Sequence, residues 1–167
     1  MPTELTITNK KLNTSILIKK NYTSRFITNL AEKNEKVFCI IDSKIKSKFN
    51  FKRYKNIKII SINSGEKIKT TYKYIDLAEK LINFNVNRKS ILVAIGGGTL
   101  GDLAGFVAST VLRGLDFYLV PTTLLSQVDS SIGGKNGINL IYGKNLLGTF
   151  YQPKKVLIDI AILSSLP

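Results

Sequence analysis

Residues 91–106 read Ile91-Leu92-Val93-Ala94-Ile95-Gly96-Gly97-Gly98-Thr99-Leu100-Gly101-Asp102-Leu103-Ala104-Gly105-Phe106, and this stretch decides the fold class. The first five residues form an uninterrupted apolar run, which is typical of a strand buried on both faces of a sheet. Three glycines follow, and an apolar stripe then recurs at helical spacing, formed by Leu103, Phe106, Val107, Thr110 and Val111. A strand, a turn and a helix in this order predict an α/β fold with a parallel sheet.

The turn between this strand and this helix satisfies the pattern G-x-G-x-x-G, with glycines at positions 96, 98 and 101. Glycines allow main-chain N–H groups to approach a phosphate without obstruction, and the helix N-terminus adds partial positive charge there. The context favours a phosphate-binding turn, and a dinucleotide is the natural ligand. The alternative is a merely tight strand-to-helix turn.

The same alternation of strands and helices continues on both sides of this stretch. Apolar spacing predicts helices over Ser24–Lys33 and Ile68–Phe84, and strands over Lys36–Ile41, Ile57–Ile62 and Phe117–Val120. Two short apolar segments, Thr3–Thr8 and Thr14–Ile18, flank Asn9–Asn13 and predict an N-terminal β-hairpin. In the second helix, the residues expected to face inward are Tyr72, Ile75, Leu77, Ala78, Leu81 and Ile82. The architecture expected is a Rossmann-like parallel sheet flanked by helices, with an N-terminal β-hairpin.

Dinucleotide-binding domains usually hold the adenosine ribose with an acidic residue at the end of a strand. Asp116 has a suitable spacing from the glycines, but it precedes its strand and should lie at the opposite edge of the sheet. Asp42 follows the strand Lys36–Ile41 and is expected at the carboxyl edge, beside the glycine turn. We therefore interpret Asp42 as the ribose candidate, with an ordinary helix-capping role as an equal alternative.

Polar residues concentrate on the glycine-rich segments that follow residue 121. Asp129, Lys135, Lys144 and Asn145 stand out, because residues 90–167 contain only five Lys and Arg in all. The glycine spacing around Lys144 does not fit a phosphate-binding P-loop, since five residues instead of four separate the glycines and Asn145 occupies the Ser or Thr position. We expect these four residues to contact a ligand from glycine-rich loops.

Composition limits the remaining possibilities. The 167 residues are 44% hydrophobic and 22% charged, which suits one compact domain. No histidine occurs, so neither a histidine-based triad nor the usual zinc site can be built. Cys39 is the single cysteine, lies in an apolar run and is expected to be a buried thiol in a reducing cytoplasm. No apolar stretch suggests a membrane span or a signal segment.

The net charge of +14 invites a nucleic-acid interpretation, but its distribution favours a different one. Residues 1–89 hold 20 Lys and Arg against 7 Asp and Glu, whereas residues 90–167, which carry the motifs, hold 5 against 4. The lysines of the basic half occur singly and form no run of five. We interpret them as a solvated basic surface and expect neither a nucleic-acid nor a membrane partner.

Several motifs together closely resemble the 3-dehydroquinate synthase family. They are the stretch Gly96–Phe106, Arg113-Gly114, Val120–Lys135, Gly143–Gly148 and Phe150–Pro153, and the resemblance runs almost without a gap from about Lys89 to Pro167. Ser64–Lys69 resembles the family's Asp-Gly-Glu-x-x-Lys loop, with Ser64 in place of Asp. The resemblance implies a cytoplasmic enzyme of the shikimate pathway, in aromatic amino-acid biosynthesis. Such an enzyme converts 3-deoxy-D-arabino-heptulosonate 7-phosphate to 3-dehydroquinate and phosphate, uses NAD catalytically and requires a divalent metal, zinc or cobalt.

The resemblance also implies roles for individual residues. Asp129, Lys135 and Asn145 would meet the sugar-phosphate substrate, and Arg113 would reach its phosphate across the interface of a homodimer. The residues implied to contact NAD are Gly65, Glu66, Lys69, Gly97, Gly98, Thr99, Leu100, Gly101, Asp102, Thr122, Thr123, Lys144, Ile162, Leu163, Ser164 and Ser165.

The family's metal is held by a Glu and two His of a second, helical domain that begins after the Leu-Pro matched here by Leu166-Pro167. We therefore expect residues 1–167 to be the NAD-binding domain alone, without a metal site and without turnover by itself. The alternatives are a non-catalytic NAD-binding remnant, another sugar-phosphate cyclase, or an enzyme similar to glycerol dehydrogenase.

Overall fold

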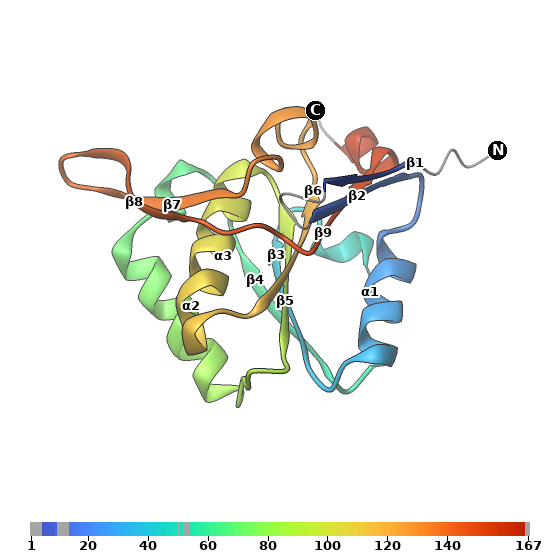
Figure 1. Ribbon diagram of the computed structural model, residues 1–167, viewed down its shortest axis with the longest axis horizontal. Coiled ribbons are helices and arrows are strands. Elements are labelled where there is room, and N and C mark those ends of the chain that lie inside the picture. Colours follow the sequence, from blue (N-terminus) through green and yellow to red (C-terminus); the bar gives the residue numbers. More distant parts are fainter. Residues whose placement is uncertain (1–4, 10–13, 50, 52–53, 166–167) are drawn as a thin grey trace.

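The computed structural model describes residues 5–9, 14–49, 51 and 54–165 (Figure 1). Seven strands form one sheet in the order β1-β2-β9-β6-β5-β3-β4, and every neighbouring pair is parallel except β1 with β2. In the order of the sheet, the strands are β1 (Leu5–Asn9), β2 (Thr14–Lys19), β9 (Lys155–Asp159), β6 (Asp116–Pro121), β5 (Ile91–Gly96), β3 (Val37–Asp42) and β4 (Ile57–Ile62). The predicted α/β class with a parallel sheet is confirmed.

Three helices cover the two faces of this sheet. Helix α1 (Thr23–Lys33) lies on one face, and helices α2 (Thr71–Asn83) and α3 (Gly98–Thr110) lie together on the other (Figure 1). Strands β3 and β5 are buried at every position, as their uninterrupted apolar sequences require. Alternate residues of each strand therefore enter two separate cores. Phe38 and Leu92 pack in the core beneath α2 and α3, and Cys39 and Val93 in the core beneath α1.

Cys39 is fully buried, as the sequence predicts. Burial raises the pKa of its thiol to about 12, so the reactive thiolate does not form near neutral pH. Cys39 is a structural core residue.

Strands β1 and β2 pair antiparallel from Leu5 opposite Ile18 to Asn9 opposite Thr14. The hairpin was predicted around Asn9–Asn13, and residues 10–13 of that segment lie outside the described residues, as do Thr3 and Glu4. Strand β2 then pairs with β9 in parallel, so the beginning of the chain and the far end of the α/β unit lie side by side.

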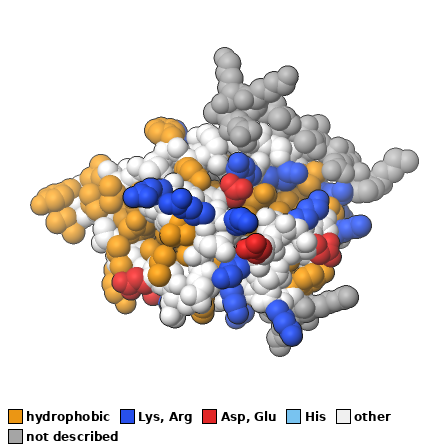
Figure 2. Space-filling view, turned by 60° about the horizontal axis from the view of Figure 1, so that its bottom comes forward, with side chains coloured by type: hydrophobic (Ala, Val, Ile, Leu, Met, Phe, Trp, Pro, Cys, Tyr) orange, Lys and Arg blue, Asp and Glu red, His pale blue; other side chains and the backbone are white. Residues whose placement is uncertain are grey.

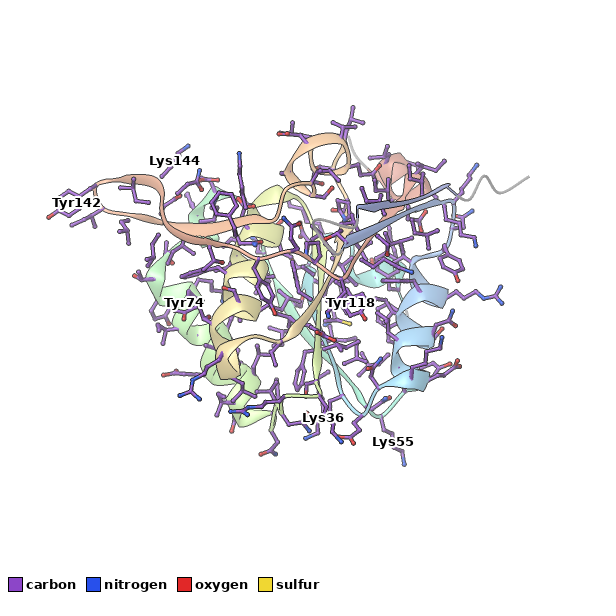
Figure 3. All side chains as sticks on the ribbon, viewed as in Figure 1. Lys36, Lys55, Tyr74, Tyr118, Tyr142 and Lys144 are labelled. Carbon is purple, nitrogen blue, oxygen red and sulfur yellow. The ribbon has the colours of Figure 1, made fainter. Side chains whose placement is uncertain are left out.

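The second helix is shorter than predicted, and part of its predicted inner face is wrong. The helix begins at Thr71 because the Thr70 side chain accepts a hydrogen bond from Lys73 N, a typical N-cap. Leu77 and Leu81 are buried as expected, but the side chains of Tyr72, Ile75 and Ile82 are exposed. Tyr74 takes their place: its ring lies 4.7 Å from that of Phe106, and its hydroxyl donates to Thr110 Oγ1 (Figure 3).

A second, two-stranded sheet replaces the predicted glycine-rich loops. Strands β7 (Lys135–Leu140) and β8 (Gly143–Phe150) form an antiparallel hairpin that packs over α3 and projects beyond the body of the molecule (Figure 1). Gly105 of α3 permits this contact, because a Cβ at that position would overlap the Asn136 side chain of β7. Helix α3 is consequently enclosed between the sheet and the hairpin, and residues on almost all of its sides are buried.

Candidate functional site

The glycine turn places the N-terminus of α3 at the carboxyl edge of β5. Gly97 is the N-cap and offers no side-chain hydrogen bond, and no acidic residue occupies the first turn. The first main-chain bond of the helix runs from Gly101 N to Gly97 O, so the N–H groups of Gly98, Thr99 and Leu100 precede it. A helix N-terminus of this kind attracts an anion through both its N–H groups and its dipole.

The end of the neighbouring strand β6 forms the other wall of this turn. Thr122 is buried, and its N–H donates to Gly96 O, which joins the ends of β5 and β6. Thr123 and Ser126 exchange hydrogen bonds at the start of a short π-helical turn, Ser126–Ser130. That turn carries Asp129 and brings Ser130 so close to the glycine turn that a Cβ on Gly98 would lie 2.7 Å from Ser130 Oγ.

A hollow of about 520 Å³ lies between the start of α3, this π-helical turn and the hairpin. Asp129, Lys135 and Asn145, the three residues expected to meet substrate, all line it, together with Asp102. Residue type and spacing did not predict the other residues of the lining, which are Ser130, Ile132, Asn136, Gly137, Leu146, Gly148, Thr149 and Phe150. Most of them belong to the hairpin, and the sequence does not show which residues of β7 and β8 face α3.

Lys69 is buried beneath the edge of this hollow and has polar partners from two distant segments. Its Nζ donates to Asp102 Oδ2 at 2.7 Å and also to Asn145 Oδ1. Burial raises the pKa of the Asp102 carboxyl, and the hydrogen bond and charge of Lys69 partly oppose that rise. The three residues join the loop before α2, the second turn of α3 and the strand β8.

The loop Gly65–Lys69 reaches the hairpin through a second set of contacts. Gly65 has a φ of 147°, in the region that favours glycine, and Glu66 begins a single 3₁₀ turn. The main-chain N–H of Asn139 donates to Lys69 O at 2.8 Å, and Asn139 Nδ2 donates to Glu66 Oε1 at 2.8 Å. Glu66 and Lys69 are thereby held at the same end of the molecule as the α3 N-terminus.

Asp42 lies at the carboxyl edge of β3, as predicted, but its carboxylate is already engaged. One oxygen accepts from Lys44 N at 3.0 Å, and the other accepts from the Ser64 hydroxyl. The short 3₁₀ helix that follows starts only at Lys46, so Asp42 closes the turn after β3 and does not cap a helix. The structure therefore does not support the alternative of a helix-capping role.

The segment after β9 is a 3₁₀ helix, Ile160–Ser165, and it contains the last four residues of the expected NAD set. Ile162 and Ser164 line a second hollow of about 310 Å³, together with Thr23, Lys48, Phe49 and Asp159, among others. Leu163 is half-buried and does not line this hollow, and the side chain of Ser165 lies outside the described residues.

Arg113 and Lys144 are among the predicted residues that line neither hollow. Arg113 is exposed just after the C-terminal end of α3, and the 13 residues of that helix separate its two ends by ~20 Å. Lys144 lies near the tip of the hairpin and points away from the body of the molecule (Figure 3). Asp116 pairs with Ile91, the first residue of β5, so its predicted position at the opposite edge of the sheet is confirmed.

Two further observations concern partners. Among the described residues, no group of three or more His, Cys, Asp and Glu side chains could hold a metal ion, and no helix is both long and apolar enough to cross a membrane. On the face shown in Figure 2, Lys and Arg side chains are spread among acidic, apolar and uncharged ones and do not form one continuous patch.

The parallel sheet, the glycine turn and the flanking helices define a Rossmann-like α/β domain. Within that class, the sequence profile described as 3-dehydroquinate synthase N-terminal matches residues 59–167, so the chain belongs to the 3-dehydroquinate synthase family.

Individual relatives agree with this assignment. The 3-dehydroquinate synthase of Buchnera aphidicola subsp. Cinara cedri (strain Cc) is 45% identical over 157 residues, which cover 87% of this chain and 42% of that protein. The enzyme of Idiomarina loihiensis is 54% identical over 110 residues, 66% of this chain and 31% of that protein. This chain therefore spans less than half the length of these relatives.

A solved structure also matches the fold. It is 2-deoxy-scyllo-inosose synthase complexed with carbaglucose-6-phosphate, NAD+ and Co2+. The TM-score is 0.83 at 28% identity, and the match covers 97% of this chain and 47% of that one.

Proposed function

We propose that this chain supplies the NAD-binding part of a 3-dehydroquinate synthase, which converts 3-deoxy-D-arabino-heptulosonate 7-phosphate to 3-dehydroquinate and phosphate. The observation that carries the proposal is the larger hollow, where the residues expected to contact substrate adjoin the open N-terminus of α3. The proposal also draws on 45–54% identity with proteins named for this activity.

In this proposal, the pyrophosphate of NAD lies on the N–H groups of Gly98, Thr99 and Leu100. The side chain of Leu100 is fully buried, so Leu100 contributes only its main chain. Thr122 and Thr123 close the turn from the β6 side. Asp42, together with Ile162 and Ser164 of the smaller hollow, would hold the adenosine end. When bound there, NAD would supply a reversible hydride acceptor for a substrate hydroxyl.

The residues of the larger hollow suit a sugar phosphate. Lys135 supplies a cation for the phosphate or the carboxylate of the substrate, and its charge stabilises the negative charge that develops as phosphate leaves. Asp129 accepts a hydrogen bond from the sugar hydroxyl and so orients it. Asn145 can hold a further oxygen with its amide. Arg113 does not line this hollow, so we propose that it serves the site of a second copy.

The divalent metal of the family does not fit the described residues, which contain no suitable ligand cluster. We propose that metal ligands come from a second domain and that this chain alone shows no turnover. Phosphate release is therefore expected only after addition of a separately produced second domain from a related enzyme, and it should be lost again in Lys135→Ala. Turnover by the chain alone would contradict this expectation.

The binding proposal is tested by titrating NAD into the chain and into Gly98→Val by calorimetry. The valine side chain would crowd Ser130 Oγ and cover the N–H groups of the turn, so NAD binding should be abolished. Thr28→Val, on α1 and remote from the turn, introduces the same side chain as a control and should bind NAD like the parent. Equal binding by Gly98→Val would refute the assignment of the turn.

Another sugar-phosphate cyclase activity is the second candidate, because the matching structure of 2-deoxy-scyllo-inosose synthase has the same fold. Identity of 28% with that enzyme is well below the identity with the 3-dehydroquinate synthases. Comparing the candidate substrates in the reconstituted assay distinguishes the two activities. NAD binding without turnover on any of them, even with the second domain, would favour a non-catalytic remnant.

A further inference from the structure

Asn139 occupies an irregular position in β7. The pairing of β7 with β8 shifts register between Ile138 and Leu140, so Asn139 has no partner residue in the ladder between them. Its polar groups are instead directed to three other residues. The N–H donates to Lys69 O at 2.8 Å, Nδ2 donates to Glu66 Oε1 at 2.8 Å, and Oδ1 accepts from Asn145 N at 2.9 Å. The bulge is therefore used for contacts between elements.

These contacts fix the conformation of Asn145. Its φ is 55°, in the left-handed region that few residues other than glycine and asparagine adopt readily. Asn139 holds the main-chain N–H of Asn145, and Lys69 Nζ donates to its side-chain Oδ1. Because an ammonium group can only donate, the amide oxygen must face Lys69, which directs Asn145 Nδ2 elsewhere. Asn145 lines the larger hollow, where Nδ2 is the group available to a ligand.

The other two contacts fix the loop that contains Glu66 and Lys69. This loop is expected to contact NAD, whereas Asn145 is expected to contact the sugar phosphate. Within the part of the chain that the structure describes, the side chain of Asn139 links the two segments, because its Nδ2 donates to Glu66 and its Oδ1 accepts from Asn145 N. An asparagine is suited to this role because it carries a donor and an acceptor on a short, planar group. An aspartate would face the Glu66 carboxylate without a proton to donate.

We propose that Asn139 is a positioning residue that locks the NAD-contacting loop and Asn145 into one geometry. This inference rests on the proposed function, since it assigns a purpose to contacts between two parts of that site. It predicts that Asn139 affects NAD affinity through Glu66 and Lys69 without touching NAD itself. It also predicts that this effect requires a hydrogen-bond donor on one of the side chains at positions 139 and 66 and an acceptor on the other.

The first measurement is amide hydrogen exchange by NMR in the free chain. Asn139→Ala should speed exchange at Asn145 N–H about fivefold or more, because that N–H loses its acceptor. Asn56→Ala is the matched control. It removes a side chain that donates to Ala31 O and Asn34 O at the far end of the sheet, and it should leave exchange at Asn145 unchanged. Unchanged exchange at Asn145 in Asn139→Ala would overturn the inference.

The second measurement is NAD affinity by calorimetry. Asn139→Ala and Asn139→Asp should each weaken NAD binding about tenfold, whereas Asn56→Ala should not, although it also removes two hydrogen bonds. The exchanged pair Asn139→Asp with Glu66→Gln restores a donor facing an acceptor, so it should bind NAD more tightly than Asn139→Asp alone.

The outcomes separate this inference from the proposed function. A parent chain that binds no NAD would refute the proposed function and, with it, the role assigned here. A parent chain that binds NAD, together with an Asn139→Ala variant that binds it equally well, would refute the positioning role alone. Absence of recovery in the exchanged pair would likewise refute it, because the hydrogen bond between positions 139 and 66 would then be irrelevant to the site.

Discussion

The central strands β3 and β5 and the hairpin β7–β8 are both rich in apolar residues, yet the two regions use them differently. Every side chain of β3 and β5 is buried. In the hairpin, Ile138 is buried, whereas Ile141 and Tyr142 are 92% and 87% exposed and Leu146 and Phe150 are largely exposed. The sheet is covered by helices on both faces, whereas the hairpin packs on α3 with one face only.

The difference separates the region that supplies folding stability from the region that supplies the candidate ligand contacts. The candidate substrate residues Lys135 and Asn145 come from the hairpin, and Asp129 comes from the irregular turn just before it. Burial of apolar surface supplies most of the folding free energy, so the sheet and its helices carry the stability. Side chains on the exposed hairpin contribute less to the folding free energy, so they can serve ligand contact with little loss of stability.

The largest expected effect contrasts the two regions directly. Leu103→Ala removes a fully buried side chain between α3 and the sheet and should lower the free energy of unfolding by about 3 kcal/mol. Leu146→Ala makes the same chemical change on the hairpin, where the side chain is 58% exposed, and should cost less than about 0.5 kcal/mol. Urea denaturation measures both, and equal costs would contradict the division of roles.

The seam between the two regions depends on Gly105. A methyl group there would overlap the Asn136 side chain, so Gly105→Ala should force β7 away from α3 and cost about 2 kcal/mol of unfolding free energy. Gly101→Ala on the same helix is the control, because its Cβ would lie 3.3 Å from a flexible Leu119 methyl group and should cost less than about 1 kcal/mol. A neutral Gly105→Ala would mean that the hairpin does not pack on α3 as described.

The ion pair between Lys69 and Asp102 gives a pH-dependent effect. The pKa of the folded Asp102 carboxyl is raised above its ordinary value of 3.8, so the folded state binds this proton more tightly than the unfolded state does. The free energy of unfolding therefore falls as the pH rises from 3.8 through the raised pKa. Lys69→Met removes the partner that opposes the rise and should enlarge this loss by on the order of 1 kcal/mol.

The measurement is the difference in unfolding free energy between pH 4 and pH 7. Asp102→Asn removes the titrating group and should flatten this part of the pH dependence in both the parent and the Lys69→Met background. If Lys69→Met has the same pH dependence as the parent, the two side chains are not coupled.

The smallest effect lies on α2, away from both regions, and serves as a baseline for surface charge. Hydrogen bonds from Lys73 and Lys80 lower the pKa of Asp76, so this carboxylate stabilises the fold above its ordinary pKa and loses that effect as the pH falls through the lowered value. Solvent screens such pairs, so Asp76→Asn should cost only about 0.3 kcal/mol at pH 7 and nothing well below pH 3. Denaturation curves at the two pH values test this.

Much of the site follows from the sequence because it depends on local chemistry. The glycine turn, Asp129, Lys135 and Asn145 were all identified from residue type and spacing, and the structure brings these three side chains to one hollow beside that turn. Asn136 and Asn139 were missed. An asparagine in a segment interpreted as a loop carries no distinctive signal, and its partners lie up to 73 residues away.

Apolar runs and glycine spacing predict the α/β class, the glycine turn and the strands β3, β4, β5 and β6, because these signals act through neighbouring residues. They did not predict β9, which also belongs to the parallel sheet. Long-range contacts are needed to show that residues 135–150 form a hairpin and that this hairpin packs over α3. They also decide that Tyr74, and not Tyr72, faces the core. These features depend on contacts between segments that are far apart in the chain. The apolar periodicity of one segment does not specify which distant segment it will contact.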